Sequence, residues 1–86
     1  FITRAEVAKI IVIAFGFPEG NNQSSFPDVP FNSDFNKYIN SLVVRGVVTG
    51  YKDKKFRPWS NISRAEAVKI IHESISIKEN WRGKER

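Results

Sequence analysis

The sequence predicts an all-α, mainly helical fold with short extended segments between the helices. Three observations support this prediction. Two segments begin with a helix-capping pattern, and hydrophobic residues recur in them every three or four positions. The β-branched stretch 47–51 is long enough only for a brief extended piece.

The first helix is predicted over Arg4–Phe15. Thr3 and Glu6 form a capping box, in which the hydroxyl accepts a first-turn N–H and the carboxylate accepts the N–H of the cap residue. Hydrophobic residues cover most of the circumference of this helix, so we expect it to be central rather than peripheral. Gly16 and then Pro18 end it.

Two further helices are expected. The second is predicted over residues 34–45, with Gly46 as its C-cap. The third begins after Ser63, and Glu66 completes a second capping box. We expect this helix to end near Ile77.

The first and third helices repeat one another in sequence. Residues 2–11 and 62–71 align with seven identical positions, and Thr3 becomes Ser63, which keeps the hydroxyl. Self-similarity at a fixed period is the signature of a repeated structural unit. The period of sixty contains a helix, a loop, a second helix, a turn and then the next copy of the first helix.

The composition excludes several functional classes. The 86 residues include no Cys, which rules out disulfides, thiolate metal sites and a Cys nucleophile. A single His72 cannot form a zinc site, and we expect it to be a satisfied side chain between core positions. We expect no cofactor and no enzymatic activity, because the chain lacks a nucleophile–base pattern and a Gly-rich phosphate loop. Its longest apolar run is too short to span a membrane.

The net charge of +5 is concentrated partly at the end of the chain, where residues 78–86 are expected to form a basic tail. The rest of the chain favours an anionic partner only weakly. Nucleic acid is an unfavourable partner, because the third helix presents hydrophobic residues where a recognition helix needs polar ones. The chain also contains no Met, so we expect it to be a segment of a longer protein.

Five short segments carry a resemblance to a known family. In order they are "FPDV" at 26–29, a helix ending before Gly46, "GYKD" at 50–53, "FRP" at 56–58 and "SRAE" at 63–66. Over residues 26–77 these segments resemble one complete S-layer homology (SLH) motif. Residues 1–17 resemble the closing helix of a preceding SLH motif. Lys54 stands at a turn position that is Gly in the family, where a positive φ is harder for a side chain to adopt.

The resemblance implies a non-catalytic anchor of the bacterial surface. SLH domains attach S-layer proteins and surface enzymes to secondary cell-wall polysaccharides, often pyruvylated, or to peptidoglycan-linked polymers. The expected location is therefore extracellular, at the cell wall or S-layer. The expected partners are an anionic wall polysaccharide and other SLH motifs of the same parent chain, or further copies of this chain. The alternative is an assembly module that mediates subunit association without binding glycan.

Six residues are candidate glycan contacts, carried over from the motif. They are Arg4, Arg64, Asp28, Phe35, Gly50 and Tyr51. A pyruvyl carboxylate needs a fixed cation, and the two arginines occupy the first position of their helices, where the helix dipole also attracts anions. The two aromatic rings could stack on a sugar, and the glycine would allow close approach to the backbone. The alternative for each arginine is an ion pair with a neighbouring carboxylate, and for Asp28 a turn or a helix cap.

Overall fold

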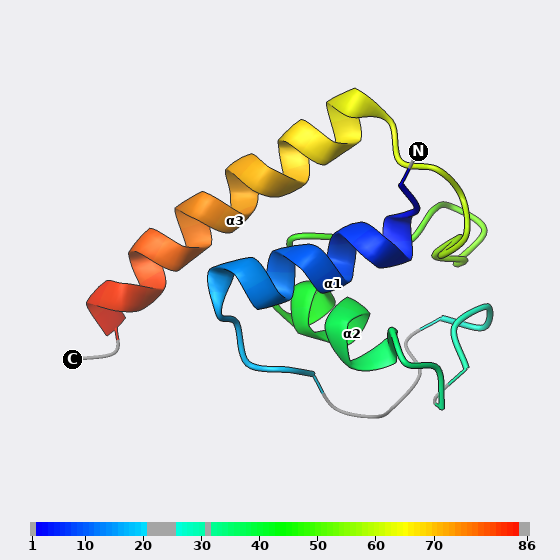
Figure 1. Ribbon diagram of the computed structural model, residues 1–86, viewed down its shortest axis with the longest axis horizontal. Coiled ribbons are helices and arrows are strands. Elements are labelled where there is room, and N and C mark those ends of the chain that lie inside the picture. Colours follow the sequence, from blue (N-terminus) through cyan, green and yellow to red (C-terminus); the bar gives the residue numbers. More distant parts are fainter. Residues whose placement is uncertain (1, 21–25, 31, 85–86) are drawn as a thin grey trace.

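The computed structural model describes residues 2–20, 26–30 and 32–84, with side chains as far as Glu79. About half of the chain is helical, and the described residues contain no β-strand. The mainly helical prediction is therefore confirmed. In Figure 1, α1 lies between α2 and α3 and packs against both of them. The helices are α1 (Arg4–Phe15), α2 (Asn36–Val44) and α3 (Arg64–Lys84).

The first helix has the predicted bounds and the predicted caps. The Thr3 hydroxyl accepts the N–H of Glu6 at 3.2 Å, and the Glu6 carboxylate accepts the N–H of Thr3 at 2.8 Å. The Thr3 hydroxyl also donates to the Glu6 carboxylate at 3.0 Å, and the two hydrogen bonds that this carboxylate accepts, from the Thr3 backbone and hydroxyl, lower the pKa of Glu6. At the other end, Gly16 adopts a φ of 70°, which a glycine tolerates without strain.

Only one side of α1 is buried. That side packs on the core, whereas Ile10 and Ile13 on the other side are 52% and 61% exposed. The helix is central, as predicted, because it packs against both α2 and α3, but one side of it is not covered by described residues. The buried residues of α1 are Arg4, Ala5, Val7, Ala8, Ile11 and Val12.

The second helix starts two residues later than predicted because Ser33 opens a turn. Its carbonyl accepts the N–H of Asn36 at 3.1 Å, and its hydroxyl accepts the N–H of Phe35 at 3.3 Å. The C-cap is Arg45, one residue before the predicted Gly46, and Gly46 follows it with a φ of 72°. Phe26, Ile39, Leu42 and Phe56 are all buried in the core.

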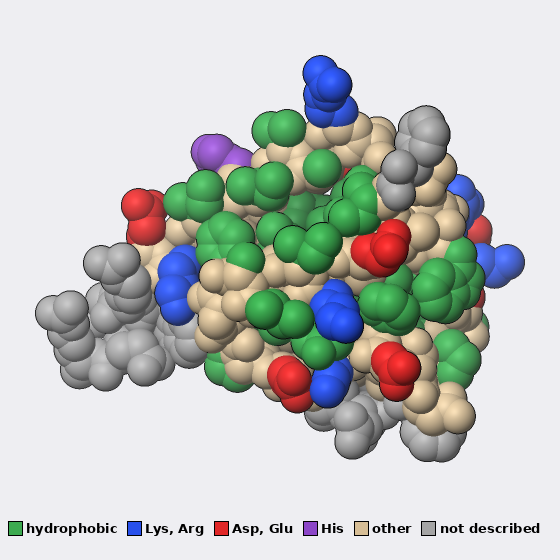
Figure 2. Space-filling model, in the orientation of Figure 1, with side chains coloured by type: hydrophobic (Ala, Val, Ile, Leu, Met, Phe, Trp, Pro, Cys, Tyr) green, Lys and Arg blue, Asp and Glu red, His purple; other side chains and the backbone are tan. Residues whose placement is uncertain are grey.

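The third helix departs from the predictions in three ways. It continues to Lys84 rather than ending near Ile77, because no Pro or Gly follows until Gly83. Ser63 accepts the N–H of Glu66 at 3.1 Å, but the Glu66 carboxylate contacts Arg4 and does not complete the box. His72 is exposed and not packed between core residues, as Figure 2 shows. The side chains beyond Glu79, which include most of the expected basic tail, lie outside the described residues.

The two copies of the repeat meet at their N-terminal ends. Thr3 and Asn61 form an antiparallel bridge, and the N–H of Ile62 donates to the carbonyl of Ile2 at 2.9 Å. The first N–H groups of a helix have no partner within it. Here those of Arg4 and Ala5 donate to carbonyls of residues 60 and 58, at 2.9 and 3.0 Å. The loop before α3 is thereby fixed to the start of α1.

A tight turn over residues 51–55 precedes that loop. The N–H of Lys54 donates to the carbonyl of Tyr51 at 2.9 Å, and the Asp53 carboxylate accepts the N–H of Lys55 at 3.0 Å. This hydrogen bond, with the contact to Arg57, lowers the pKa of Asp53. Lys54 has a φ of 67°, in the left-handed region that strains a residue with a Cβ.

Replacing Lys54 with Gly is expected to stabilise the protein by about 0.5–1 kcal/mol. Relief of the left-handed strain, about 1–2 kcal/mol, exceeds the entropic cost of about 0.5–1 kcal/mol for a glycine. Urea denaturation followed by circular dichroism measures the difference. Lys55→Gly is the matched control, since Lys55 does not have a positive φ and its replacement should destabilise by about 0.5–1 kcal/mol. A loss of stability in Lys54→Gly would contradict the account of this turn.

Candidate functional site

The Arg4 side chain is almost completely enclosed, at 3% exposed. Its Nε donates to the carbonyl of Phe56 at 2.8 Å and its Nη2 to the carbonyl of Thr49 at 3.3 Å. Its Nη1 forms an ion pair with the carboxylate of Glu66. Three acceptors that follow one another in the SLH-like segment therefore hold a guanidinium that belongs to the preceding helix.

Aromatic rings complete the surroundings of this guanidinium. Its carbon lies 4.5 Å from the ring centre of Phe56 and 4.7 Å from that of Tyr51. The guanidinium of Arg57 lies 4.3 Å from the same Tyr51 ring, and it also pairs with Asp53 at 3.1 Å. Cations are attracted to aromatic faces at such distances. Tyr51 is thus in contact with two cations rather than available as an isolated ring.

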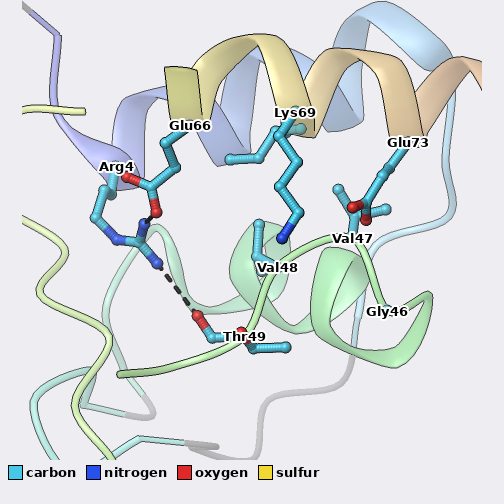
Figure 3. A pocket seen from close by; sticks show the side chains of 9 residues that line it. Arg4, Gly46, Val47, Val48, Thr49, Glu66, Lys69 and Glu73 are labelled. Atoms are coloured by element: carbon cyan, nitrogen blue, oxygen red, sulfur yellow. Dashed lines mark hydrogen bonds and ion pairs between the residues drawn. The ribbon is translucent and has the colours of Figure 1, made fainter. Parts of the chain in front are cut away.

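A groove opens beside Arg4, between α3 and residues 46–49. Arg4 and Glu66 meet at one end of it, and Glu73 lies near Val47 at the other (Figure 3). Between them the Lys69 side chain extends from α3 toward Val48 (Figure 3). Lys69 forms no ion pair within the part of the chain that the structure describes. A mixed set of charges along this groove suits a polar ligand that carries an anionic group.

Arg64 has a different environment from its sequence equivalent Arg4. It begins α3, is exposed, and its side chain makes no hydrogen bond or ion pair with any described residue. It is not part of the lining of the groove. The acceptors that enclose Arg4 belong to residues 49–66, which follow α1 in the chain. The described residues include no equivalent segment after α3, so Arg64 stays exposed.

The Asp28 carboxylate makes a long-range contact rather than the local turn or helix cap considered as its alternative role. Its two carboxylate oxygens accept the N–H groups of Phe56 and Arg57, at 2.9 and 2.8 Å. Arg57 has a φ of 60°, and the carboxylate holds the chain in this left-handed conformation. Asp28 therefore fixes the backbone at Phe56, whose carbonyl accepts a hydrogen bond from Arg4.

The remaining two candidates also pack against neighbours. A Cβ added to Gly50 would lie 2.5 Å from the ring of Phe26, so the absence of a side chain permits this packing. Phe35 makes an edge-to-face contact with Trp59, with ring centres 5.6 Å apart. Of the six candidates, only Arg4 lines the groove. Tyr51 contacts the Arg4 guanidinium but lies outside the lining, as do the other four candidates.

Sequence reasoning did not single out Lys69 or Thr49 as candidate residues. Lys69 could have been found from the repeat, because it aligns with Lys9 and is one of the seven identical positions. The role of Thr49 depends on its backbone carbonyl, which no side-chain pattern reveals. Within the described residues, no group of acidic or His side chains is placed to hold a metal ion, and no helix is long and apolar enough to cross a membrane.

Comparison with known proteins decides the family. The family model described as S-layer homology domain matches residues 25–68, about half of the chain. The chain belongs to the S-layer homology domain family. The match covers the segment that encloses Arg4 and the first residues of α3, so the resemblance predicted from the five motifs is confirmed.

Three curated relatives are similar to this SLH chain. A surface layer protein of Brevibacillus choshinensis is 34% identical and a middle cell wall protein of Brevibacillus brevis 31% identical, each over 95% of the chain and 8% of the relative. A cellulosome-anchoring protein of Acetivibrio thermocellus is 49% identical over 45% of the chain and 9% of the relative. The chain thus spans less than a tenth of the length of each. No solved structure matches it significantly.

These findings establish a coarse function. The SLH chain is a cell-surface anchoring module associated with the bacterial cell wall, as the sequence predicted.

Proposed function

We propose that this SLH chain is a non-catalytic module that binds an anionic wall polysaccharide in the groove between α3 and residues 46–49. The observation that carries the proposal is the position of Lys69, whose ammonium reaches into the groove without an ion-pair partner among the described residues. A cation placed in this way suits a carboxylate on a sugar, such as a pyruvyl ketal.

The two ends of the groove fit the same ligand class. Arg4 bonds three protein acceptors and is 3% exposed, so its proposed contribution is to hold Glu66 in place at the end of the groove. Glu66 and Glu73 can accept hydrogen bonds from sugar hydroxyls. The ligand anion would therefore lie toward Lys69, and neutral hydroxyls toward the carboxylates.

Arg64 is proposed as a second anion contact. It is exposed at the N-terminus of α3, where unsatisfied N–H groups and the helix dipole add to its positive charge. By the repeat, Arg64 would face a following SLH motif in the way that Arg4 faces residues 49–66. Asp28, Gly50, Tyr51 and Phe35 are proposed to support ligand contacts mainly through their packing.

An assembly function is the second candidate, and exposed hydrophobic residues on α3 favour it. Val68, Ile71 and Ile75 are 59%, 44% and 46% exposed, and hydrophobic side chains gather over α3 and α1 in Figure 2. Ala8, Ile11 and Phe15 occupy the equivalent positions on α1 and are buried or half-buried there. The proposed occupant of the α3 surface is a further SLH motif of the parent protein.

Co-sedimentation with purified cell-wall sacculi tests the polysaccharide proposal. The chain is expected to bind intact sacculi and to lose binding after the secondary polysaccharide is removed chemically. Lys69→Ala is expected to weaken binding about tenfold, since hydrogen bonds to charged groups contribute about 1.5–3 kcal/mol. Lys9→Ala is the matched control, because Lys9 is the same residue at the equivalent helical position and does not line the groove.

Other outcomes would reject parts of this proposal. Equal weakening by the two lysine variants would mean that binding follows net charge and not the groove. Binding that survives removal of the polysaccharide would point to another wall polymer. No binding by a folded chain, together with a mass that rises with concentration in sedimentation velocity, would favour the assembly function.

A further inference from the structure

Trp59 is a large aromatic residue that the fold leaves in solvent, at 65% exposed. Its backbone is nevertheless firmly held. The carbonyls of Pro58 and Ser60, on either side of it, accept the first two N–H groups of α1 at 3.0 and 2.9 Å. The N–H of Ser60 also closes a turn onto the carbonyl of Arg57 at 3.2 Å. Hydrogen bonds of the flanking residues thus fix the backbone of Trp59 before any ligand binds.

The indole ring itself has one described aromatic neighbour. Its plane meets that of Phe35 at 83°, with the ring centres 5.6 Å apart. Phe35 is half-buried and packs against the hydrophobic core, so it links the exposed indole to the fold. Such edge-to-face contacts are favourable and restrict the ring. Most of the indole surface remains open to solvent.

We infer that Trp59 is a stacking surface for a pyranose ring of the wall polysaccharide, an inference that rests on the proposed function. The apolar C–H face of a sugar matches an aromatic face, while its hydroxyls need polar neighbours. The residues that follow Trp59, Ser60 and Asn61, are exposed and polar. A hydrophobic surface of a partner protein would match the exposed hydrophobic side chains of α3 better than it would match Trp59 and its polar neighbours.

The orientation of Trp59 favours binding for an entropic reason as well. A ring that is already held by Phe35 and by the hydrogen-bonded loop loses little conformational freedom when a ligand covers it. The sugar stacked on Trp59 would be a different unit from the anionic sugar at Lys69, because Trp59 does not line the groove. The ligand is therefore a polymer with at least two recognised units, and not a single monosaccharide.

A fluorescence titration tests this inference. Trp81→Phe leaves Trp59 as the sole Trp of the chain. Polysaccharide released from sacculi is the probe. Saturation is expected to shift the Trp59 emission and to reduce its quenching by acrylamide. Trp59→Ala is expected to weaken binding about five- to tenfold, whereas Trp59→Phe keeps an aromatic face and most of the affinity.

The remaining outcomes separate this inference from the function on which it rests. Equal affinities for Trp59→Ala and the parent chain, or unchanged Trp59 fluorescence at saturation, would overturn the stacking surface alone. A parent chain that does not bind the polysaccharide would overturn the proposed function and the stacking surface with it. Protection of Trp59 that depends on protein concentration and not on polysaccharide would also overturn the inference, since it would identify a protein contact.

Discussion

Arg4→Ala is expected to destabilise the protein by about 3 kcal/mol, whereas Arg64→Ala should change its stability by less than about 0.5 kcal/mol. The two residues are the same type at the same position of the repeat, but Arg4 is 3% exposed and Arg64 lies in solvent. Removing Arg4 leaves two backbone carbonyls and the Glu66 carboxylate without their donor. We expect the lower end of the range for broken buried ion pairs because Glu66 keeps 31% of its side chain in solvent.

Urea denaturation of the two alanine variants measures this contrast. Arg4→Lys is a useful third variant, because it keeps the charge but loses the planar fork that reaches three acceptors. It should restore only part of the stability and should remain folded if Arg4→Ala does not. Equal stabilities for Arg4→Ala and Arg64→Ala would contradict the structural role of Arg4.

Phe56→Ala is expected to lower the free energy of unfolding by about 4 kcal/mol. Phe56 is 1% exposed, its ring centre lies 5.2 Å from that of Phe26, and the Arg4 guanidinium lies on it at 4.5 Å. Truncating a buried Phe removes its transfer free energy and leaves a cavity, at a typical cost of about 3–5 kcal/mol. The enclosure of Arg4 would be weakened in the same variant.

Two controls make the Phe56 prediction specific. Phe56→Leu fills most of the volume and should cost less than about 1.5 kcal/mol. Trp59→Ala removes a larger but exposed ring and should cost about 1 kcal/mol, mainly the contact with Phe35. A Phe56→Ala variant that is no less stable than Trp59→Ala would mean that Phe56 is not part of the core.

The sequence predicted α1 correctly because its signals are local. The Thr3–Glu6 capping box and Gly16 each act within a few residues, and the structure reproduces both. The same local pattern at Ser63 and Glu66 was only half correct, since the Glu66 carboxylate binds Arg4 and not its own cap. A long-range charge partner changed the outcome there, and no local pattern contains that partner.

The candidate site was harder to predict for a related reason. The repeat placed Arg4 and Arg64 in equivalent positions, but their environments depend on whether a following segment covers each of them. Thr49 binds Arg4 through a backbone carbonyl, so its side chain gave no signal. Lys69 became a candidate only when α3 and residues 46–49 were seen to face each other across the groove.

The most direct test of the polysaccharide site is a nuclear magnetic resonance titration of the ¹⁵N-labelled chain with the released wall polysaccharide. We expect saturable shifts of the backbone amides of Val48, Thr49 and Lys69 and of the Arg64 side-chain Nε–H. The Lys9 amide should stay unchanged, because Lys9 does not line the groove. A folded chain whose groove signals do not move, or whose shifts gather around Lys9, would contradict the proposal that this groove binds the polysaccharide.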